Sequence, residues 1–335
     1  MYLKLQGKVE IIGRADGANP NRKLSFISFH SIDIELDIFK INSTCKIKIP
    51  TIGRLSSNGV YALNSVQTAR EFERGDRITV WLGYNGKLDQ EFTGFIYRIN
   101  YTSPLEIECE GYEFQLRKVL ETKTWRKTTI IEVLKYLTAG TDIILSPNIQ
   151  DIEFDKFVVP AGSSALQELQ KLKEETLLEA YFDGNVLYMG MAYAVTNGTV
   201  KYRLGWNTIK DNDLKYRNAD DVQVKVKAIY LKPDGQKVEV SVGDPDGKVE
   251  VIKSKTISGE AALKGFAQSM LQKFKYSGYE GKITAFLWPF AKPTMAGQLD
   301  DPKYNERKGT YYITSTKVKA DRNGGRRTTS FTIKL

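Results

Sequence analysis

Few residues of this 335-residue chain have the types and spacing of a catalytic site. His30 is the only histidine, so a Ser-His-Asp triad and a Cys-His pair would both depend on it. The sequence contains no G-x-S-x-G nucleophile elbow. The nearby Asp33 and Glu35 fit the solvent face of a strand. We therefore expect His30 to be structural or exposed, and we predict no catalytic residue and no enzymatic activity.

Metal and cofactor motifs are equally sparse. Cys45 and Cys109 lie in strand-like runs and form no C-x-x-C pair, so we expect two small core residues that stay reduced. The run Asp244-Pro245-Asp246-Gly247 resembles the start of a calcium loop, but Lys255 stands where the loop needs its glutamate, which favours a hairpin turn. Neither glycine-rich phosphate-binding motif occurs. We predict no metal and no cofactor, while spacing alone leaves open whether two acidic residues converge as a glycosidase pair.

Length and composition are those of an ordinary globular protein. The chain is 41% hydrophobic and 27% charged, and it is long enough for two or three domains. No apolar run approaches the roughly 20 residues that span a membrane. The first residues lack the apolar core of a secretory signal, so we expect the protein to be made and kept in a cytoplasm-like compartment until assembly.

Positive charge is concentrated at the C-terminal end of the chain. Residues 303–335 hold nine lysines and arginines against Glu306 and Asp321, a net charge of 9 − 2 = +7 out of +9 for the chain. Such a basic end could contact nucleic acid, an acidic protein or solvent. We expect Arg322, Arg326 and Arg327 to lie at the tip of a last hairpin and to contribute nothing to the core.

The stretch from Glu71 to Ile99 predicts the hairpin around which the first part of the chain is organised. Apolar residues alternate with others at Ile78, Val80 and Leu82, and Asn85-Gly86 suits a two-residue turn with positive φ. Phe92, Gly94 and Ile96 share one face of the return strand, where the glycine indicates a bulge or a close backbone approach.

The remaining residues of 1–119 also read as strands. The runs LSFISFHSIDIELDIFKI, TCKIKI and LEIECEGYEFQL are strand-like, and Pro50 and Gly53 end the second of them. We expect a loop or short helix from Arg54 to Arg70. The spacing of strands and turns favours an all-β barrel or sandwich.

Residues 120–192 change to an α/β pattern. Thr129 to Glu132 has the pattern of a capping box, and a second helix is expected from about Ser164. The two helices place on their apolar faces Ile130, Val133, Leu134 and Leu137, then Leu166, Leu169, Leu172 and Leu177. Two strands are expected around Asp183-Gly184.

Residues 193–335 return to β structure with one helix. VQVKVKAIYL predicts a strand that buries Val222, Val224 and Val226, and turns are expected at Pro233-Asp234-Gly235 and at Pro245-Asp246-Gly247. An amphipathic helix is expected over about 258–276, with one face made of Leu263, Phe266, Ala267, Met270, Leu271 and Phe274. A final hairpin is expected around Asn323-Gly324-Gly325.

The order of these signals resembles the phage baseplate hub family, which includes late control protein D and the hub part of type VI secretion spike proteins. In the first barrel the resemblance is carried by Phe72, Gly75-Asp76, Ile78, Val80, Gly83-Tyr84, Phe92, Gly94, Ile96, Cys109, Gly111-Tyr112 and Leu116. In the last part it is carried by GYEGKITAFLWP, Pro293 to Gly297, the strand around Tyr312, and Gly324-Gly325. Ala296 departs from the family, which often has a proline directly before the glycine of that turn.

The resemblance implies a mainly β fold with an α+β insertion, in which two similar β-barrel-like domains (1–119 and 193–335) flank a small α/β domain (120–192). It implies a structural hub of a phage or prophage tail, or of a tail-derived injection machine, that connects the tail tube to the central spike. The partners implied are the tube, the spike and two further copies of the chain in a homotrimer with a pseudo-sixfold ring. Non-specific contact with DNA in the lumen and residence in the virion tail also follow from it.

Three other readings compete with the hub. A hub of a type VI or extracellular contractile injection system would have the same pattern. A cell-wall carbohydrate-binding module would need aromatic residues along one groove, and Trp81, Trp125, Trp206 and Trp288 are scattered. A basic nucleic-acid-binding protein would explain the charge, although no recognised binding motif accompanies it.

Overall fold

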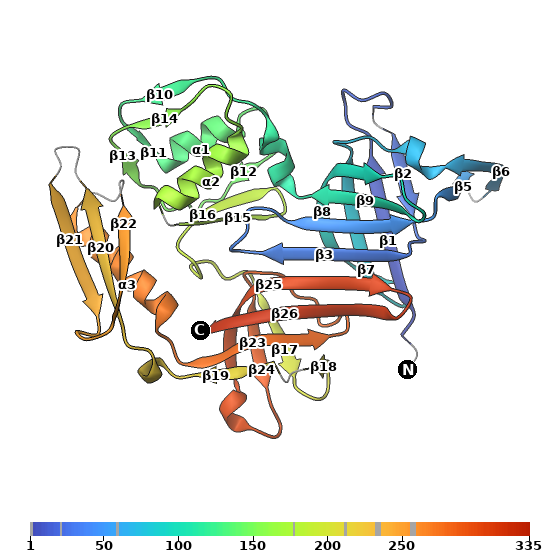
Figure 1. Ribbon diagram of the computed structural model, residues 1–335. Helices are drawn as coiled ribbons and strands as arrows, with labels where there is room; N and C mark the ends of the chain where they lie inside the picture. Colours follow the sequence, from blue (N-terminus) through green and yellow to red (C-terminus); the bar gives the residue numbers. More distant parts are fainter. Residues whose placement is uncertain are drawn as a thin grey trace.

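The computed structural model describes residues 3–20, 22–57, 60–176, 178–210, 213–231, 236–254 and 259–335. The protein is mainly β, as predicted, and the α-helices of the described residues are two in a middle unit and one near residue 267 (Figure 1). The predicted Pro233-Asp234-Gly235 turn, Leu177 and the Ser258 helix start lie outside the described residues. The boundaries at residues 119 and 192 stay predictions.

The first β region is built around the predicted hairpin of β7 and β8. Ile78, Val80 and Leu82 are fully buried, and Asn85 and Gly86 have φ values of 52° and 86°, as the two-residue turn requires. Its elements, in which η denotes a 3-10 helix, are β1 (Leu5–Ile12), β2 (Lys23–Phe26), β3 (Ser31–Asp37), β4 (Thr44–Ile49), β5 (Ile52–Ser57), β6 (Val60–Gln67), η1 (Thr68–Glu71), β7 (Arg77–Tyr84), β8 (Lys87–Asn100) and β9 (Leu105–Glu110).

Two local features of this region bear on the sequence predictions. An added Cβ at Gly94 would lie 2.1 Å from the Glu110 carbonyl oxygen, which confirms the close backbone approach. The loop or short helix expected from Arg54 to Arg70 is wrong for most of its length, because β5 and β6 pair there as a separate two-stranded sheet. The β-branched and aromatic residues of VYALNSVQ favour a strand, but serine and asparagine among them obscured that signal.

The middle unit packs two helices against short strands. Thr129 caps α1 through a hydrogen bond from the Glu132 amide, and Ser164 and Gln167 form a reciprocal capping box on α2. Its elements are η2 (Tyr112–Arg117), β10 (Lys123–Trp125), β11 (Thr128–Thr129), α1 (Ile130–Thr138), β12 (Ile144–Leu145), β13 (Glu153–Phe154), β14 (Phe157–Val159), α2 (Ala165–Thr176), β15 (Glu179–Asp183) and β16 (Val186–Gly190). The predicted apolar stripe of α1 forms the centre of this unit's core.

The second β region continues the large sheet and carries a separate appendage. Its sheet strands are β17 (Thr199–Arg203), β18 (Thr208–Lys210), β19 (Lys215–Arg217), β23 (Gly278–Ala285), β24 (Ala296–Asp300), β25 (Gly309–Asp321) and β26 (Gly324–Lys334), with η3 (Ala219–Asp221) and η4 (Asn305–Arg307) between them. The appendage consists of β20 (Val224–Leu231), β21 (Lys237–Gly243), β22 (Lys248–Ser254) and α3 (Glu260–Phe274). The predicted amphipathic helix is thus confirmed as α3.

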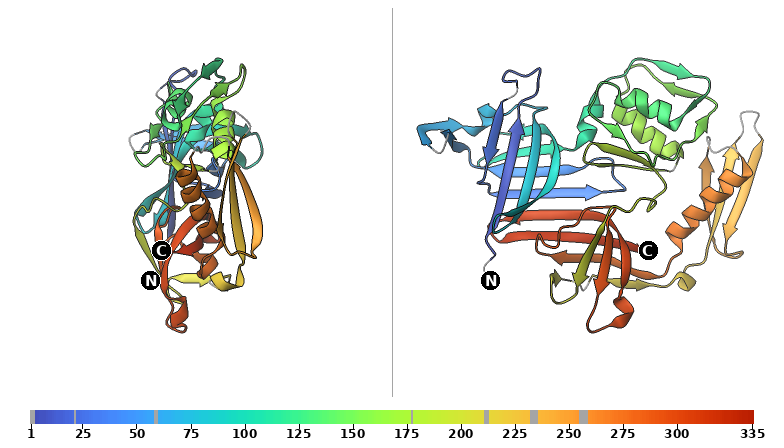
Figure 2. Two further views of the ribbon diagram at one scale, coloured as in Figure 1. Left: turned by 90° about the vertical axis from the view of Figure 1, so that its left-hand side faces the viewer. Right: turned by 180° about the vertical axis from the view of Figure 1, so that it is seen from behind.

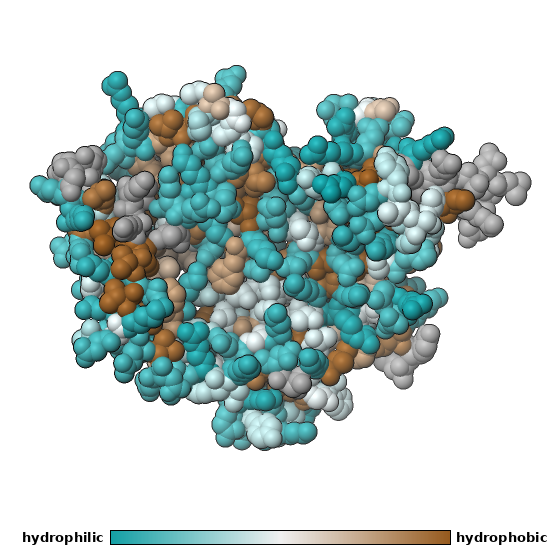
Figure 3. Space-filling view, in the orientation of Figure 1, coloured by the Kyte–Doolittle hydropathy of each residue, from teal (hydrophilic) through white to brown (hydrophobic). Residues whose placement is uncertain are grey.

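The appendage has a core of its own. Helix α3 covers one face of the three-stranded sheet, which is seen most clearly from behind (Figure 2). The register sets Lys225 and Lys227 beside Val249 and Val251 on the other face, where both valines are 50% exposed. In the space-filling view, hydrophobic residues gather over this unit (Figure 3).

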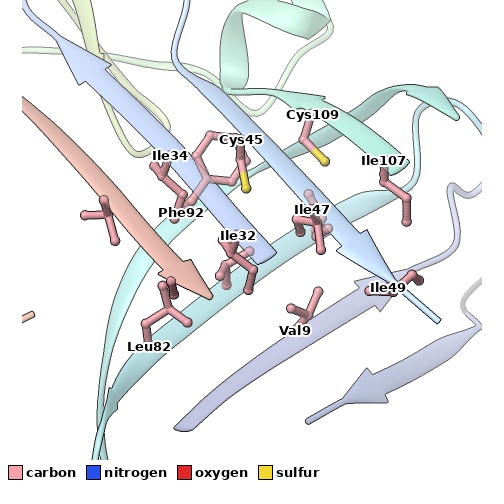
Figure 4. Packing of buried hydrophobic residues seen from close by; sticks show 14 of the residues in the cluster. Val9, Ile32, Ile34, Cys45, Ile47, Ile49, Leu82, Phe92, Ile107 and Cys109 are labelled. Carbon is pink, nitrogen blue, oxygen red and sulfur yellow. The ribbon is translucent and has the colours of Figure 1, made fainter. Parts of the chain in front are cut away.

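The two β regions share one 14-stranded sheet. Eleven of its strands follow the order β18-β23-β26-β25-β3-β4-β9-β8-β7-β1-β2, while β19 pairs with β23, β24 with β25 and β17 with β24 off this path. The sheet curls around a core of isoleucine, valine and leucine, in which Cys45 and Cys109 lie opposite each other on β4 and β9 (Figure 4). Both cysteines are free and buried. This agrees with the expectation that they are small core residues.

The same strand order occurs in both β regions. In chain order, the six strands of the first region are β1, β3, β4, β7, β8 and β9, and the six positions of the second are β17, β18 with β19, β23, β24, β25 and β26. If these positions are numbered 1 to 6 in each region, neighbours in the sheet follow the order 1-4-5-6-3-2 in both. Neighbouring strands in these two sets are antiparallel with one exception, the parallel pair β17 and β24. The corresponding pair of the first region, β1 and β7, is antiparallel.

Candidate assembly site

The two β regions meet by strand pairing inside one chain. Residues Ser315–Asp321 of β25 pair antiparallel with Asp37–Ser31 of β3. On the solvent face of this junction, charged side chains form rows across the strands. Lys317 lies 3.0 Å from Glu35, whose pKa is lowered mainly by the hydrogen bond from Lys40. Lys46 on β4 continues the pattern to Glu106 and Glu108 on β9. Opposite charges in register stabilise this pairing over shifted ones.

A buried ion pair fixes the same junction from the core side. Arg327 of β26 and Glu91 of β8 are 1% and 2% exposed, and two hydrogen bonds of 2.5 and 3.0 Å join them. The remaining donors of Arg327 reach the carbonyls of Leu287 and Ala291, so all five guanidinium N–H groups have acceptors. Burial raises the pKa of Glu91, and Arg327 opposes that shift.

This finding corrects the expectation for the last hairpin. Arg322 lies at the exposed β25–β26 turn, as predicted, but Arg327 is fully buried. The alternation of β26 turns Arg327 inward, where Glu91 from a strand 236 residues away supplies the compensating charge. Sequence reasoning missed this pair because nothing local to Arg327 indicates its partner.

The loop between β23 and β24 holds the two regions together. Its Leu287 is buried in the core of the first region, and its Trp288 donates a hydrogen bond of 3.2 Å to Asp89. Tyr84 of β7 packs edge-on against Trp288 and donates a hydrogen bond to the carbonyl of Gly325. The relative position of the two regions is therefore set by a packed interface as well as by strand pairing.

Each region also presents one strand edge that has no partner within the described part of the chain. β18 and β19 occupy the position in the second region that β3 occupies in the first, and they pair only with β23. Strand β7 pairs with one edge of β8 from Lys87 to Phe95, and the next residue on that edge, Ile96, is hydrogen-bonded to Gly75 and Asp76. The rest of that edge, from Tyr97 to Asn100, corresponds to the stretch of β25 that pairs with β3.

Exposed aromatic side chains, two of them beside arginines, lie toward the two ends of the open β18–β19 edge. Trp206 and Tyr216 are 79% and 59% exposed. Arg203 stacks on Trp206 at 5.5 Å, and Arg307 lies 5.4 Å from the ring of Tyr304, which is also exposed. Trp, Tyr and Arg are the residues enriched at the energetic centres of protein interfaces.

A surface hollow lies beside the matching edge of β8. It has a volume of about 630 Å³ and is lined by Arg14, Phe72, Glu73, Arg74, Tyr97, Arg98, Ile99 and Tyr101. Arg74 lies over the ring of Tyr97 at 5.4 Å, and Tyr101 is 79% exposed. This edge therefore offers the same combination of aromatic and cationic groups as the β18–β19 edge.

A buried carboxyl group marks the exit from the first β region into the middle unit. Oε1 of Glu113 accepts hydrogen bonds of 2.8 Å from the amides of Ser43 and Gly111. Oε2 is buried and has no hydrogen-bond partner among the described residues. Burial raises the pKa of Glu113 to about 8.

The other residues singled out in the sequence have structural surroundings. His30 is exposed at the start of β3. Asp244 closes the turn to Gly247 through a backbone hydrogen bond and accepts hydrogen bonds of 2.7 Å from Lys275. The predicted turn is therefore present, but it is not a hairpin turn, because β20 lies between β21 and β22 in the sheet. Across the described ranges, no three His, Cys, Asp or Glu side chains group closely enough to hold a metal ion. None of the described helices is both long and apolar enough to cross a membrane.

The fold is that of known phage tail proteins. A tail protein from Neisseria meningitidis is 13% identical, with a TM-score of 0.66 over 99% of this chain and 96% of its own. The 43 kDa tail protein of a Shewanella oneidensis prophage is 14% identical, with a TM-score of 0.65 over 98% of each chain. An Escherichia coli component of the type VI secretion system is 11% identical, with a TM-score of 0.51 over all of this chain and 77% of its own.

Sequence comparison finds less than structural comparison. No protein-family model matches the chain, and no curated protein matches it in sequence. The predicted resemblance is confirmed at the level of the fold, since the similar structures are phage or prophage tail proteins and a component of the type VI secretion system.

Proposed function

We propose that this protein is the non-enzymatic hub of a phage or prophage tail, where it joins the tail tube to the central spike. The observation that carries the proposal is the repeated strand order, which defines two equivalent junctions. One junction forms within the chain, and the strand edges of the other are unpaired in the described part. Within the chain, the second strand of the first region pairs with the fifth strand of the second region. The corresponding edges for the reverse pairing, the outer edge of β18–β19 and Tyr97–Asn100 of β8, are both open in the described part.

The open edges favour a homotrimer. If β18–β19 of one copy add to Tyr97–Asn100 of the next, the new contact repeats the internal junction and leaves no sheet edge open between copies. Two similar regions per chain then give six similar modules from three chains. Such a ring matches a sixfold tube on one side and a threefold spike on the other.

The division into domains supports the same role. We propose that residues 1–119 and 193–335 act as the two ring-forming domains and that residues 120–192 project from the ring. The first ends near η2, and the second contains the β20–β22 appendage. In this arrangement the protein resides in the virion tail after synthesis in the host cytoplasm.

The ring is tested by imaging and by cross-linking. Cysteines placed at Tyr216 and Arg98 should form disulfides between copies and give covalent dimers and trimers, whereas cysteines at Lys156 and Arg98 should not. Images of tail tips should show three copies around the axis. Six copies per ring, or one copy off the axis, would contradict the proposal.

A hub of a type VI or extracellular contractile system is the second candidate, and the likeness to the Escherichia coli secretion component favours it. Both candidates predict the same ring, and the identity of the neighbouring tube protein separates them. If DNA passes the lumen, its binding should be weak, independent of sequence and lost between low and physiological salt. Tight binding to one sequence at 0.15 M salt, where the Debye length is about 8 Å, would favour a nucleic-acid-binding protein instead.

A further inference from the structure

A groove runs along the uncovered part of strand β1. β7 pairs with β1 from Leu5 to Ile12, but β2 covers the opposite edge only from Val9 to Ile12. The rest of that edge, residues 5–8, faces a groove with a volume of about 760 Å³. Its other walls are residues 27–30 and the β25–β26 turn at Asp321 and Arg322. The views in Figures 1 and 2 agree that the start of the chain lies beside this turn.

The backbone of β1 presents unpaired groups to this groove. The carbonyl of Lys4 accepts a hydrogen bond from the Asn85 amide, and its own amide donates to the Asn85 side chain, so even-numbered residues of β1 point toward β7. The odd-numbered residues consequently point to the opposite edge, where Val9 and Ile11 pair with β2. Leu5 and Gly7 turn their N–H and C=O groups the same way, with Gly7 buried against the ring of Phe29, and nothing in the described part of the chain hydrogen-bonds them there. Two such residues are the start of a strand-addition site.

The side chains around the groove are apolar in the middle and basic at the rim. Ile27 lines the groove and is 81% exposed. The ring of Phe29 packs where a Cβ of Gly7 would lie. Lys4, His30 and Arg322 are exposed at the rim, and the one acidic lining residue, Asp321, lies 3.8 Å from Lys319.

We propose that this groove binds an extended acidic segment of a partner protein, which adds as a strand to β1 at Leu5 and Gly7. In an extended segment with alternating residues, apolar side chains on one face reach Ile27 and Phe29. Carboxylates on the other face then lie near Lys4 and Arg322. The open backbone groups select a peptide over a nucleic acid, and the positive rim selects an acidic one.

This inference does not rest on the proposed ring. The groove lies at the Gly86 end of the β7–β8 hairpin, whereas the β8 edge of the ring contact begins at Tyr97. Loss of peptide binding therefore leaves the trimer intact, and loss of the trimer leaves the groove intact.

The test uses a fluorescent peptide of alternating glutamate and valine with the full-length protein. Two control peptides have proline at two of the valines, or lysine in place of glutamate. Anisotropy should show binding of the acidic peptide that weakens with salt, about tenfold weaker binding of the proline peptide and none of the lysine peptide. Hydrogen exchange should show new protection of the Leu5 and Gly7 amides.

Matched charge variants locate the binding. Lys4→Glu with Arg322→Glu should weaken the acidic peptide about tenfold or more, which corresponds to about 1.4 kcal/mol. Lys156→Glu with Lys264→Glu makes the same change of net charge at exposed sites away from the groove, and should leave binding unchanged. Equal binding of the proline peptide, equal loss in both variants, or association of the protein with itself through this groove would overturn the proposal.

Discussion

The two β regions share a strand order but differ in what surrounds it. The first adds β2 and the β5–β6 ribbon, whereas the second inserts a whole appendage, β20–β22 with α3, between β19 and β23. The first strand of each region also runs in a different direction relative to its neighbour, since β1 is antiparallel to β7 whereas β17 is parallel to β24. The shared part is the sheet that makes the internal junction. The two β regions differ outside this sheet, on surfaces where they would contact different neighbouring proteins.

The junction itself combines two kinds of electrostatic contact. Arg327 and Glu91 are buried and fully hydrogen-bonded, while Lys317 and Glu35 are paired on the solvent face of the same sheet. A buried charge that loses its partner is costly, and an exposed pair contributes little because water and salt screen it. Substitutions at the junction should therefore have very unequal effects.

The largest effect is expected at the buried pair. Glu91→Ala leaves the Arg327 guanidinium buried without its counter-charge, and we expect a loss of about 3–5 kcal/mol in the free energy of unfolding. Urea unfolding, followed by circular dichroism, measures this loss. The double variant Glu91→Leu, Arg327→Met removes both charges and should recover much of the stability. A double variant as unstable as the single one would show that the ion pair itself, and not the avoided unpaired charge, holds the junction.

The next effect concerns Glu113, which lies where the first region continues into the middle unit. Its folded pKa of about 8 lies above its ordinary value of 4.5, so the folded protein binds this proton more tightly than the unfolded chain. This contribution to stability is fully present below pH 4.5 and is lost as the pH rises toward 8, on the order of 1 kcal/mol for each pH unit. Glu113→Gln should flatten that part of the dependence, measured as urea midpoints between pH 5 and 8. An unchanged slope would assign it to other groups.

Local sequence patterns predicted the elements of this fold better than they predicted its junctions. The Asn85-Gly86 turn, the helix start near Ser164 and the α1 stripe each depend on neighbours a few residues away, and all three are confirmed. The buried position of Arg327 depends on Glu91, and no periodicity within β26 indicates it. The β5–β6 ribbon was missed for a different reason, because serine and asparagine within VYALNSVQ obscured the strand signal.

The candidate site was predicted only as a consequence of the fold resemblance. That likeness implied two similar regions and a ring, but not which edges would be open. The exposed aromatic residues along the β18–β19 edge come from separate strands and turns, so their placement on one edge appears only in three dimensions. The scattered positions of the tryptophans in the sequence gave no indication of it.

A smaller effect should distinguish close packing in the two regions. An added Cβ at Gly94 would lie 2.1 Å from a backbone oxygen, whereas at Gly297 it would lie 2.2 Å from the ring of Phe331. The ring can shift and the paired backbone cannot, so Gly94→Ala should cost about 3 kcal/mol and Gly297→Ala about 1 kcal/mol. Thermal unfolding of the two variants, compared in the same buffer, checks the order. Equal losses would show that Phe331 is held as rigidly as the β8–β9 backbone.

The smallest effect is expected at the exposed rows of charge across the junction. Lys317 and Glu35 lie 3.0 Å apart, and their side chains are 58% and 29% exposed, so solvent screens most of their attraction. Lys317→Ala should lower the free energy of unfolding by about 0.5 kcal/mol or less at low salt, and by less still at 1 M salt. The same urea experiment used for Glu91→Ala provides the comparison within one junction. If Lys317→Ala instead cost as much as Glu91→Ala and kept that cost at high salt, the solvent-face rows would carry the register of β3 against β25, and the buried pair would be a consequence of that pairing.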